Sequence, residues 1–338
     1  MNRNTRFHNA RRSKKDEFYT QISDIENEIQ YYARHFRGKT VYCNCDDPRV
    51  SNFFRHFAQM FEIYGLKRLI ATCYKNQNAD LFSQHRSEKA VYLEYLGDQD
   101  GNNRPDDHET EVIPMEGDGD FRSPECIELL KQADIVVTNP PFSLWREYLA
   151  LLMEYEKKFL IIGHQGQVSY KDVFPLFKEN KIWFGYGFKG DAAHFESRYE
   201  DHATASDRVD GMIRVSGVQW YTNLKHDKRY VKMNLWHRYR PDKYPPYENF
   251  DAIEVSKTAS IPEDYAGVMG VPITFLRKYN PDQFEILGLD RYVNETHPEL
   301  LVPHVKGHSN SIVNGKIKYH RIFIRNKHPR HPDEKSRH

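Results

Sequence analysis

The residues whose chemistry is most specific are Asn139-Pro140-Pro141-Phe142, which follow the apolar run Asp134–Thr138 and precede a helical pattern that begins at Leu144. Two successive prolines have no N–H donor and hold the backbone extended, so carbonyl groups at this point can face a ligand. A planar exocyclic amine has two N–H donors, and the Asn139 side-chain oxygen and the Pro140 carbonyl could accept both. The Phe142 ring could stack on a heteroaromatic base.

An isolated Asn-Pro-Pro-Phe segment is more often only a tight connection between a strand and a helix. Here the segment follows a buried strand and shares its domain with acidic residues at the ends of two earlier strands. That context favours a site that binds and activates an amine.

Acidic and aromatic residues at other strand ends could bind a cofactor. A carboxylate there can accept a hydrogen bond from a ribose hydroxyl or an α-amino group, and a phenylalanine can flank an adenine ring. The alternatives are a solvated turn for the later acidic pair and a helix cap for one member of the earlier pair. The candidate residues are Asp46, Asp47 and Pro48 after the first strand, and Asp118, Asp120 and Phe121 further along the chain.

A third feature lies near the start of the chain, at Phe18-Tyr19-Thr20. By itself this segment is typical of a helix start, with Thr20 or Ser23 as the N-cap. Its functional interpretation is a lid, because a Phe-Tyr-Thr arm placed before the first strand could pack against an adenosine or methionine moiety.

The pattern of strands and helices predicts an α/β fold. Apolar runs separated by helical patterns imply right-handed crossovers and a parallel sheet, and the unbroken runs indicate strands covered by helices on both faces. Order is expected to weaken from Gly185 to Ser216, and a domain boundary is expected near residue 230. The predicted strands are 41–45, 66–74, 134–138, 159–163 and 218–224, and the predicted helices are 24–36, 53–61, 127–131 and 144–155, with a polar loop or hairpin at 98–107.

The composition excludes a disordered chain and a membrane protein. The 338 residues include 49 Lys and Arg against 48 Asp and Glu, with 39% hydrophobic residues. No apolar run approaches the roughly 18 residues of a membrane helix, and residues 1–15 lack the apolar stretch of a signal peptide. We therefore expect a soluble, cytoplasmic protein.

The formal net charge of +1 conceals a strong separation of charge along the chain. Residues 91–130 hold twelve acids against two bases, residues 221–240 hold six bases against one acid, and residues 311–330 hold six bases and no acid. A basic run alone is usually a solvated surface. Combined with the amine-binding motif and interleaved aromatic residues, it favours a nucleic-acid surface. Its candidate residues are Lys225, Lys228, Arg229, Lys232, Arg238 and Arg240.

Several other chemistries have no support in the sequence. The four cysteines, Cys43, Cys45, Cys73 and Cys126, form no CxxC pair and are expected to be reduced and buried. The histidines lack metal-binding spacing, so no metal is expected. Dinucleotide, P-loop and nucleophile-elbow motifs are absent.

Taken together, these segments resemble the motifs of amino-directed DNA methyltransferases that use S-adenosylmethionine, in the γ order with the lid motif first. Four segments are similar to the EcoRI-type adenine-specific enzymes in particular. Where the wider superfamily has a glycine-rich loop after the first strand, this chain has residues 46–52, a feature that the EcoRI type shares. The four segments are Asp16–Gln21, Tyr42–Ser51, Gly117–Arg122 and Gly267–Phe275.

The resemblance implies a Rossmann-like doubly wound sheet and a site-specific enzyme that methylates N6 of a flipped adenine in double-stranded DNA, with no metal. It implies a catalytic domain over residues 1–230, whose residues 1–38 form the lid and first helix, and a C-terminal target-recognition region over 231–338. The catalytic residues would be Asn139, Pro140, Pro141 and Phe142. The cofactor-binding residues would be Phe18, Tyr19, Thr20, Asp46, Asp47, Pro48, Asp118, Asp120 and Phe121.

Alternatives from this pattern are a methyltransferase for another planar amine, namely an RNA adenine, a DNA cytosine N4 or a protein glutamine, and a catalytically idle DNA-binding protein. We expect a monomer on DNA, no membrane association, and a genetic pairing with a restriction endonuclease.

Overall fold

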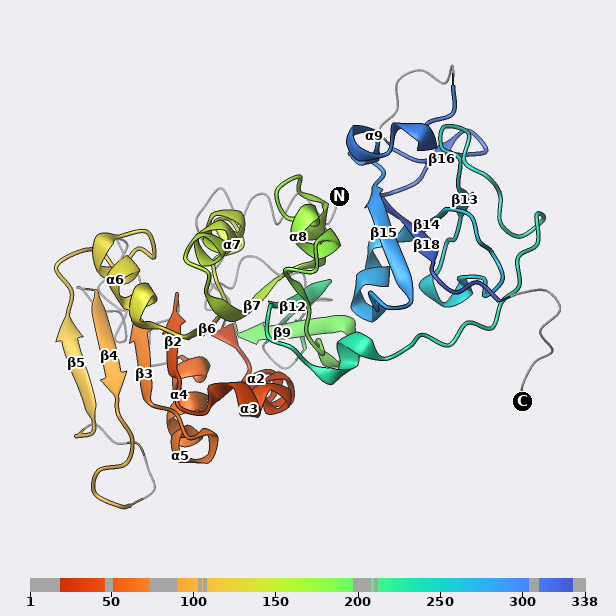
Figure 1. Cartoon of the computed structure of the whole chain (residues 1–338). Coiled ribbons are helices and arrows are strands. Elements are labelled where there is room, and N and C mark those ends of the chain that lie inside the picture. The colour runs from red at the N-terminus through yellow and green to blue at the C-terminus, as the bar shows by residue number, and fades with distance from the viewer. Residues whose placement is uncertain are drawn as a thin grey trace. The chain divides into compact units, whose positions relative to one another are not determined.

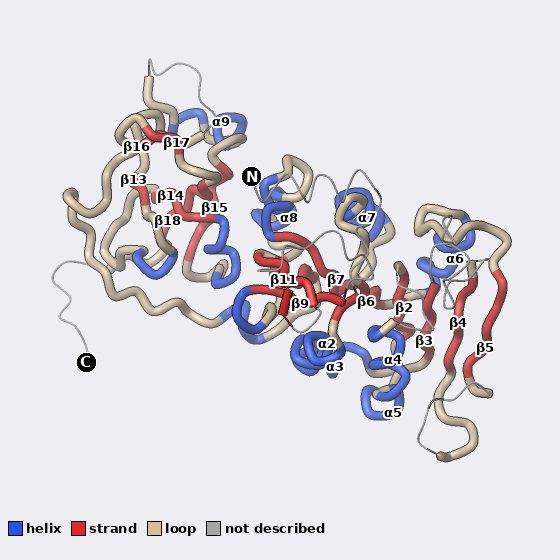
Figure 2. Tube along the Cα trace, turned by 180° about the vertical axis from the view of Figure 1, so that it is seen from behind, coloured by secondary structure: helices blue, strands red, loops and turns tan. Residues whose placement is uncertain are grey.

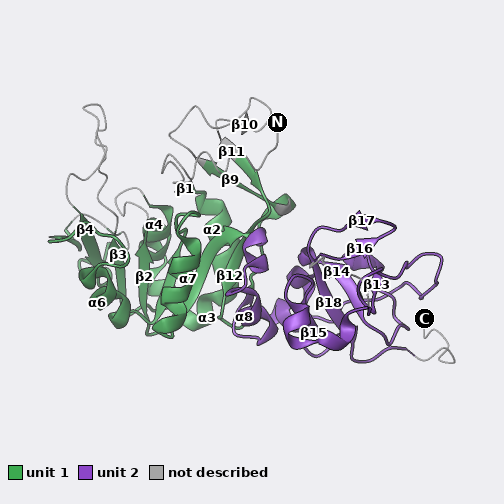
Figure 3. Ribbon diagram, turned by 90° about the horizontal axis from the view of Figure 1, so that it is seen from above, with its two compact units in different colours: residues 1–164, 184–226 green, residues 165–183, 227–338 purple. Residues whose placement is uncertain are grey.

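The computed structural model describes residues 19–45, 51–72, 90–102, 105, 108–196, 208–209, 212–303 and 310–330. The chain forms two compact units. Unit 1 comprises Met1–His164 and Phe184–His226, and unit 2 comprises Gln165–Trp183 and Asp227–His338 (Figure 3). From the sequence, residues 165–183 were expected in the first domain, whereas they cluster with unit 2.

An eight-stranded mixed sheet forms the centre of unit 1 (Figure 1). The four strands β3, β2, β6 and β7 are parallel, whereas β4, β5 and β12 join their neighbours in antiparallel fashion. The sheet order is β5 (Thr110–Pro114), β4 (Val91–Tyr95), β3 (Arg68–Thr72), β2 (Thr40–Asn44), β6 (Ile135–Thr138), β7 (Lys158–His164), β12 (Val218–Thr222) and β8 (Trp183–Phe184).

This mixed α/β architecture agrees with the predicted fold class, but the prediction of a parallel sheet holds only for its four central strands. The described part of the connection between β4 and β5 contains no helix, and these strands pair in antiparallel fashion.

Helices cover both faces of the central sheet (Figures 1 and 2). The sequence forms them where apolar residues recur every three or four positions and a capping residue starts the run. Ser51 caps α4, and its hydroxyl accepts a hydrogen bond from the Phe53 N–H at 3.2 Å. One face carries α2 (Ile22–Ile29), α3 (Ala33–Phe36), α4 (Asn52–Gln59) and α5 (Phe61–Tyr64), and the other carries α6 (Pro124–Gln132) and α7 (Trp145–Glu154).

Two predicted caps are wrong. Thr20 and Ser23 do not start the first helix, whose N-cap is Gln21, because Thr20 belongs to a strand and Ser23 lies inside the helix. Ser51, rather than Asp46 or Asp47, caps α4. A short 3₁₀ turn, Gln30–Tyr32, separates α2 from α3 within the predicted helix 24–36.

A small antiparallel sheet in unit 1 corrects the expectation of weak order between Gly185 and Ser216. The fully buried carboxylate of Glu28 accepts hydrogen bonds from the backbone N–H groups of Tyr186 and Gly187 at 2.7 and 2.8 Å, and so fixes the chain that leads into this sheet. Its strand order is β1 (Tyr19–Thr20), β9 (Ala192–Glu196), β11 (Met212–Ser216) and β10 (Arg208–Val209).

Unit 2 has a hydrophobic core of its own. Within it the carboxylate of Glu254, 2% exposed, accepts two hydrogen bonds from Arg321, at 2.9 and 2.7 Å, and one from the Tyr247 hydroxyl. Burial would raise the pKa of Glu254, but these hydrogen bonds outweigh it and lower that pKa. The unit contains α8 (Phe174–Lys178), α9 (Val293–Thr296), a sheet in the order β13 (Ile253–Glu254), β14 (Met269–Pro272), β18 (Arg321–Asn326) and β15 (Phe284–Leu289), and the hairpin β16 (Ile312–Val313) and β17 (Lys316–Ile317).

Within the described ranges, no helix has the length and apolar character required to cross a membrane. Cys43 and Cys126 are free and buried, as expected, whereas Cys45 is half-buried and Cys73 lies outside the described residues.

The buried His56 on α4 should make the stability of unit 1 depend on pH. Its side chain is 3% exposed, and burial lowers the pKa of His56 from 6.5 to about 4. As pH falls from about 6.5 to about 4, the unfolded chain takes up a proton that the folded chain does not, so the folded state loses stability. The loss has an upper limit of about 3 kcal/mol and is complete below pH 4.

Thermal unfolding of His56→Phe between pH 7 and pH 4 should therefore show a smaller fall in Tm than wild type. The remaining fall in Tm includes a contribution from His320 in unit 2, because burial also lowers the pKa of His320 to about 4. The exposed His237 offers a control, since His237→Phe should keep the wild-type slope. An unchanged slope in His56→Phe would contradict the prediction.

Candidate active site

The candidate site lies where the strand order reverses at the centre of the sheet. The chain runs from β2 to β3 on one side, and β6 returns on the other side of β2. In open α/β sheets ligands bind outside the carboxyl ends of the strands at such a switch point. Here these ends are Asn44 and Thr138, and the next residue after Thr138 is Asn139.

The ends of β2 and β6 are joined by side-chain hydrogen bonds around Asn44. The Thr138 hydroxyl donates to the Asn44 carbonyl, and the Tyr148 hydroxyl, from α7, donates to Asn44 Oδ1. The Tyr148 ring meets Phe121 edge to face, with centroids 5.0 Å apart. Burial raises the pKa of Tyr148 well above its ordinary value, so the hydroxyl keeps its proton as a donor. One buried tyrosine thus connects three motif-bearing segments.

Asn139-Pro140-Pro141-Phe142 forms the entry to α7. Asn139 is 7% exposed, Pro140 is buried and Pro141 is half-buried. The Pro141 carbonyl accepts the Leu144 N–H at 3.0 Å, so this carbonyl belongs to the turn that starts the helix. Phe142 is 6% exposed and packs in the main hydrophobic cluster of unit 1. The segment therefore presents an amide and the Pro140 carbonyl in surroundings from which most water is excluded.

Asp118, Asp120 and Phe121 lie between β5 and α6. Asp120 receives three hydrogen bonds from Arg122, two at 2.9 Å and one at 2.7 Å. The Arg122 side chain, which donates to this carboxylate, lowers the pKa of Asp120. Asp118 is exposed and accepts the Asp120 N–H at 3.0 Å. Only Phe121 of these three contacts Tyr148.

The lid segment is attached to the start of α4. Strand β1 pairs with β9, and Asn52 Nδ2 donates to the Thr20 carbonyl at 2.8 Å. Thr20 is 2% exposed, and among the described residues its hydroxyl oxygen has no hydrogen-bond partner. A buried hydroxyl is costly unless a ligand or water satisfies it. Phe18, Asp46, Asp47 and Pro48 lie outside the described residues.

Sequence reasoning missed Asn44, Tyr148 and the backbone of Cys45. Cys45, directly after β2, has φ of 84°, a left-handed conformation that residues with a side chain adopt rarely. Tyr148 shares the buried face of α7 with Trp145, Leu149 and Leu152, so its pattern alone indicates only core packing. The sequence signal that could have identified Tyr148 is its position within three helical turns of Pro140 and Pro141.

The predicted DNA-binding cations differ in exposure and in ion pairing. Lys225 and Lys232 are exposed and Lys228 is half-buried. Arg238 Nε lies 3.5 Å from Glu263 Oε1. The Arg240 guanidinium donates to the two carboxylate oxygens of Asp242 at 3.1 and 3.0 Å.

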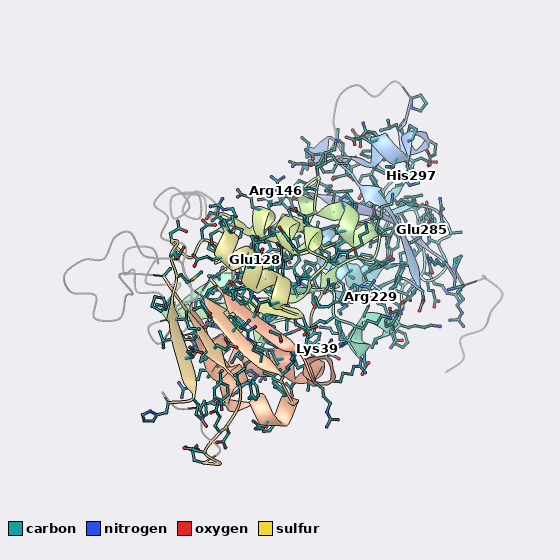
Figure 4. All side chains as sticks on the ribbon, turned by 60° about the vertical axis from the view of Figure 1, so that its left-hand side comes forward. Lys39, Glu128, Arg146, Arg229, Glu285 and His297 are labelled. Atoms are coloured by element: carbon teal, nitrogen blue, oxygen red, sulfur yellow. The ribbon has the colours of Figure 1, made fainter. Side chains whose placement is uncertain are left out.

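Arg229, labelled in Figure 4, corrects the prediction for this group. Its side chain is only 6% exposed, donates to Asn180 Oδ1 at 2.6 Å and stacks over the Trp183 ring at 4.0 Å. A guanidinium held in this way stabilises unit 2 and is not available to phosphate.

One acidic group has atoms close enough to hold a metal ion. Asp98, Asp100 and Glu109 place carboxylate oxygens within 4.8 Å of one another. Glu109 Oε1 already accepts the N–H groups of Gln99 and Asp100, at 2.5 and 3.3 Å. Asp100 is exposed, Asp98 is half-buried and Glu109 is buried, and exposed acidic groups are common without a bound ion, so this cluster alone indicates no metal site.

The sheet, its switch point and the buried amide at the end of β6 define a mixed α/β protein with a candidate ligand site at the carboxyl edge of its parallel strands. Comparison with known families is more specific, because the model described as adenine-specific methyltransferase EcoRI matches residues 6–327. The chain belongs to this family of adenine-specific methyltransferases.

Two relatives illustrate how close the similarity is. The Type II methyltransferase M.EcoRI of Escherichia coli is 47% identical over 332 residues, which cover 96% of this chain and 97% of the relative. The Type II methyltransferase M.MpnI of Mycoplasma pneumoniae is 37% identical over 331 residues, covering 94% and 97%. No solved structure matches.

The hydrogen bond from Tyr148 to Asn44 can be removed without changing the packing of the ring. We expect Tyr148→Phe to lower the stability by about 1 kcal/mol. Methyl transfer should fall about tenfold in kcat/KM, because the end of β2 and α7 lose their connection.

The matched control is Tyr244→Phe in unit 2, which also loses one buried hydroxyl bond, from Tyr244 to the Ser260 carbonyl at 2.8 Å. Equal loss of activity in both variants would show that Tyr148 has only a general structural role.

Proposed function

We propose that this chain transfers a methyl group from S-adenosylmethionine to N6 of adenine in double-stranded DNA, as the modification enzyme of a restriction-modification system. Membership in the adenine-specific family supports the reaction. The observation that carries the site is the position of Asn139, a buried amide directly after β6 at the switch point of the sheet.

S-adenosylmethionine would supply an electrophilic methyl group on a positively charged sulfur. Two features of the chain fit such a ligand at the carboxyl ends of β2 and β3. The Thr20 hydroxyl is buried and has no partner in the part of the chain that the structure describes, and α4 begins at Asn52, whose side chain donates to the Thr20 carbonyl.

Asp120 retains acceptor capacity, because Arg122 occupies three of the roughly four acceptor sites of its carboxylate. Phe18, Tyr19, Thr20, Asp46, Asp47, Pro48, Asp118, Asp120 and Phe121 remain the proposed cofactor-binding residues.

The role of Asn139 follows from the two N–H groups of an adenine amine. Asn139 Oδ1 and the Pro140 carbonyl accept one each, which fixes the nitrogen and increases its electron density. Burial strengthens both interactions, because water does not compete for the acceptors. The Phe142 ring would contact the base. The target adenine must leave the duplex to reach this segment, at a cost of a few kcal/mol that pocket contacts offset.

The finer features of the fold belong to the same proposal. We propose a Rossmann-like doubly wound catalytic domain over residues 1–230 and a target-recognition region over residues 231–338. The separate core of unit 2, the exposed cations Lys225 and Lys232 and the half-buried Lys228, with Arg238 and Arg240, support a DNA-binding role. We expect a monomer on DNA.

Asn139→Ala should reduce kcat by about 100-fold or more, because one of two acceptors for the amine is lost. The affinity for S-adenosylmethionine should change by less than about threefold. Asn139→Asp keeps an acceptor oxygen in nearly the same shape and should retain more activity than the alanine variant.

The assay offers labelled S-adenosylmethionine with plasmid DNA, RNA and protein, and digestion of the product identifies the modified group. Wild-type turnover in Asn139→Ala would refute the mechanism. Label in RNA, in cytosine or in protein would favour the alternative acceptors, and failure to bind the cofactor would indicate an idle DNA-binding protein.

A further inference from the structure

The hairpin β16–β17 of unit 2 is a rigid two-stranded ribbon. Ile312 pairs with Ile317 and Val313 with Lys316. The two turn residues, Asn314 and Gly315, have φ of 50° and 69°. Left-handed backbone at both positions is characteristic of the tight type I′ turn, which matches the twist of the flanking strands.

The base of the hairpin is anchored in the core of unit 2. The Ser311 N–H and hydroxyl both lie 3.3 Å from Asp290 Oδ2, and Asp290 is 1% exposed. The Ile312 N–H donates to Asn249 Oδ1 at 3.0 Å. Ile312 and Val313 are buried, so one strand is held by the core while the other faces outward.

The outward strand carries side chains that the fold of unit 2 does not use. Ile317 is 57% exposed and Tyr319 is 70% exposed. Lys316 is exposed and Lys318 is half-buried. Within β17, alternation along the strand sets Lys316 and Ile317 on opposite sides. Lys318 and Tyr319 follow the strand, and the Lys318 N–H donates to the Ser311 carbonyl at 2.8 Å.

Ion pairing separates these two lysines from the three arginines of residues 311–330. Arg321 pairs with Glu254, Arg325 with Glu285 and Arg330 with Glu263. In the part of the chain that the structure describes, Lys316 and Lys318 have no ion-pair partner. The nearby acid Glu248 accepts the Gly315 N–H at 2.6 Å. The sixth base of the segment, Lys327, is exposed and donates to the Pro281 carbonyl at 2.7 Å. Two of the three bases of this segment for which no ion pair is described therefore belong to the hairpin segment 316–318.

We propose that the β16–β17 hairpin enters a groove of duplex DNA, with Lys316 and Lys318 at phosphates and Ile317 and Tyr319 against sugars and base edges. This inference rests on the proposed function for the identity of the polymer. The major groove accommodates a two-stranded β-ribbon, and apolar side chains there contact thymine methyl groups. A ribbon that carries both lysines and exposed apolar groups has the chemistry for both phosphate and base contact.

The hairpin belongs to the basic segment 311–330 of the sequence and is separate from the basic run 221–240, which holds the candidate DNA-binding residues named from the sequence. In Figures 1 and 2 it lies at the upper end of unit 2, whereas the chain that leaves the 3₁₀ turn Asp227–Tyr230 runs along the lower side of the same unit. The two basic segments of unit 2 thus do not form one continuous face, and the contribution of each to DNA binding can be measured separately.

The test compares two double variants of the full-length enzyme. Lys316→Ala with Lys318→Ala removes the hairpin charges, and Lys257→Ala with Lys278→Ala removes two exposed lysines elsewhere in unit 2. Binding to a 25-base-pair duplex is followed by fluorescence anisotropy over a range of salt concentrations. We expect the hairpin variant to weaken binding about tenfold and to reduce the slope of log K against log salt by about 2, because about 0.9 counterion is released per phosphate contact.

Tyr319→Ala tests base contact and should raise the KM for plasmid DNA while leaving the salt slope of the duplex unchanged. Each variant is checked for a wild-type Tm and for binding of S-adenosylmethionine. A wild-type KM and salt slope in the hairpin variant, or an equal loss in the Lys257 and Lys278 control, would overturn the proposal. If the wild-type enzyme itself fails to methylate DNA, the proposed function fails instead, so the two failures are distinguishable.

Discussion

The hydrogen bonds that join Asn44 to Thr138 and Tyr148 connect β2 with β6 and α7. Strands β2 and β6 are the neighbours between which the strand order of the central sheet reverses. Strand β2 starts one half, which continues through β3, and β6 starts the other, which continues through β7. Strands that diverge from a switch point leave no crossover across their carboxyl ends, which is why ligands bind there in open α/β sheets. The Asn44 side chain and carbonyl are engaged in protein hydrogen bonds at the end of β2, and Asn139 directly follows the neighbouring strand β6.

The prediction from sequence succeeded where burial dictated residue type. The runs 134–138 and 159–163 are apolar because helices cover both faces of β6 and β7, and that requirement is visible in one dimension. The antiparallel strands β5 and β9 were harder to predict from the sequence. Strand β5 has exposed or half-buried residues throughout, so nothing in its composition demanded a strand. Strand β9 begins with two alanines, whose small side chains give almost no strand signal.

The candidate site was predictable in its motifs but not in their connections. Asn139 and Phe121 are 18 positions apart in the sequence, and only the fold shows that Phe121 contacts Tyr148, on the helix that Asn139-Pro140-Pro141-Phe142 introduces. The local excess of basic residues was the least informative sequence signal for the candidate DNA-binding surface. Arg229 has the residue type of a phosphate ligand but is buried against Trp183, and the arginines of β18 are paired with acids that lie far away in sequence. Net charge over a segment counts such residues and the unpaired Lys316 equally, although only unpaired charge attracts a polyanion.

The backbone at Cys45 shows how this family can do without the glycine-rich loop of other methyltransferases. A residue with a side chain at φ of 84° costs about 1–3 kcal/mol, and such strain persists only when the surroundings fix the chain on both sides. The preceding residue, Asn44, is fixed by Thr138 and Tyr148, and the helix that follows is fixed by the Ser51 cap and by Asn52 on Thr20. A glycine would relieve the strain, but it would also free the chain at the end of β2. Constraint by the hydrogen bonds of Asn44 therefore replaces the conformational freedom of glycine, and it makes the backbone at Cys45 depend on Tyr148.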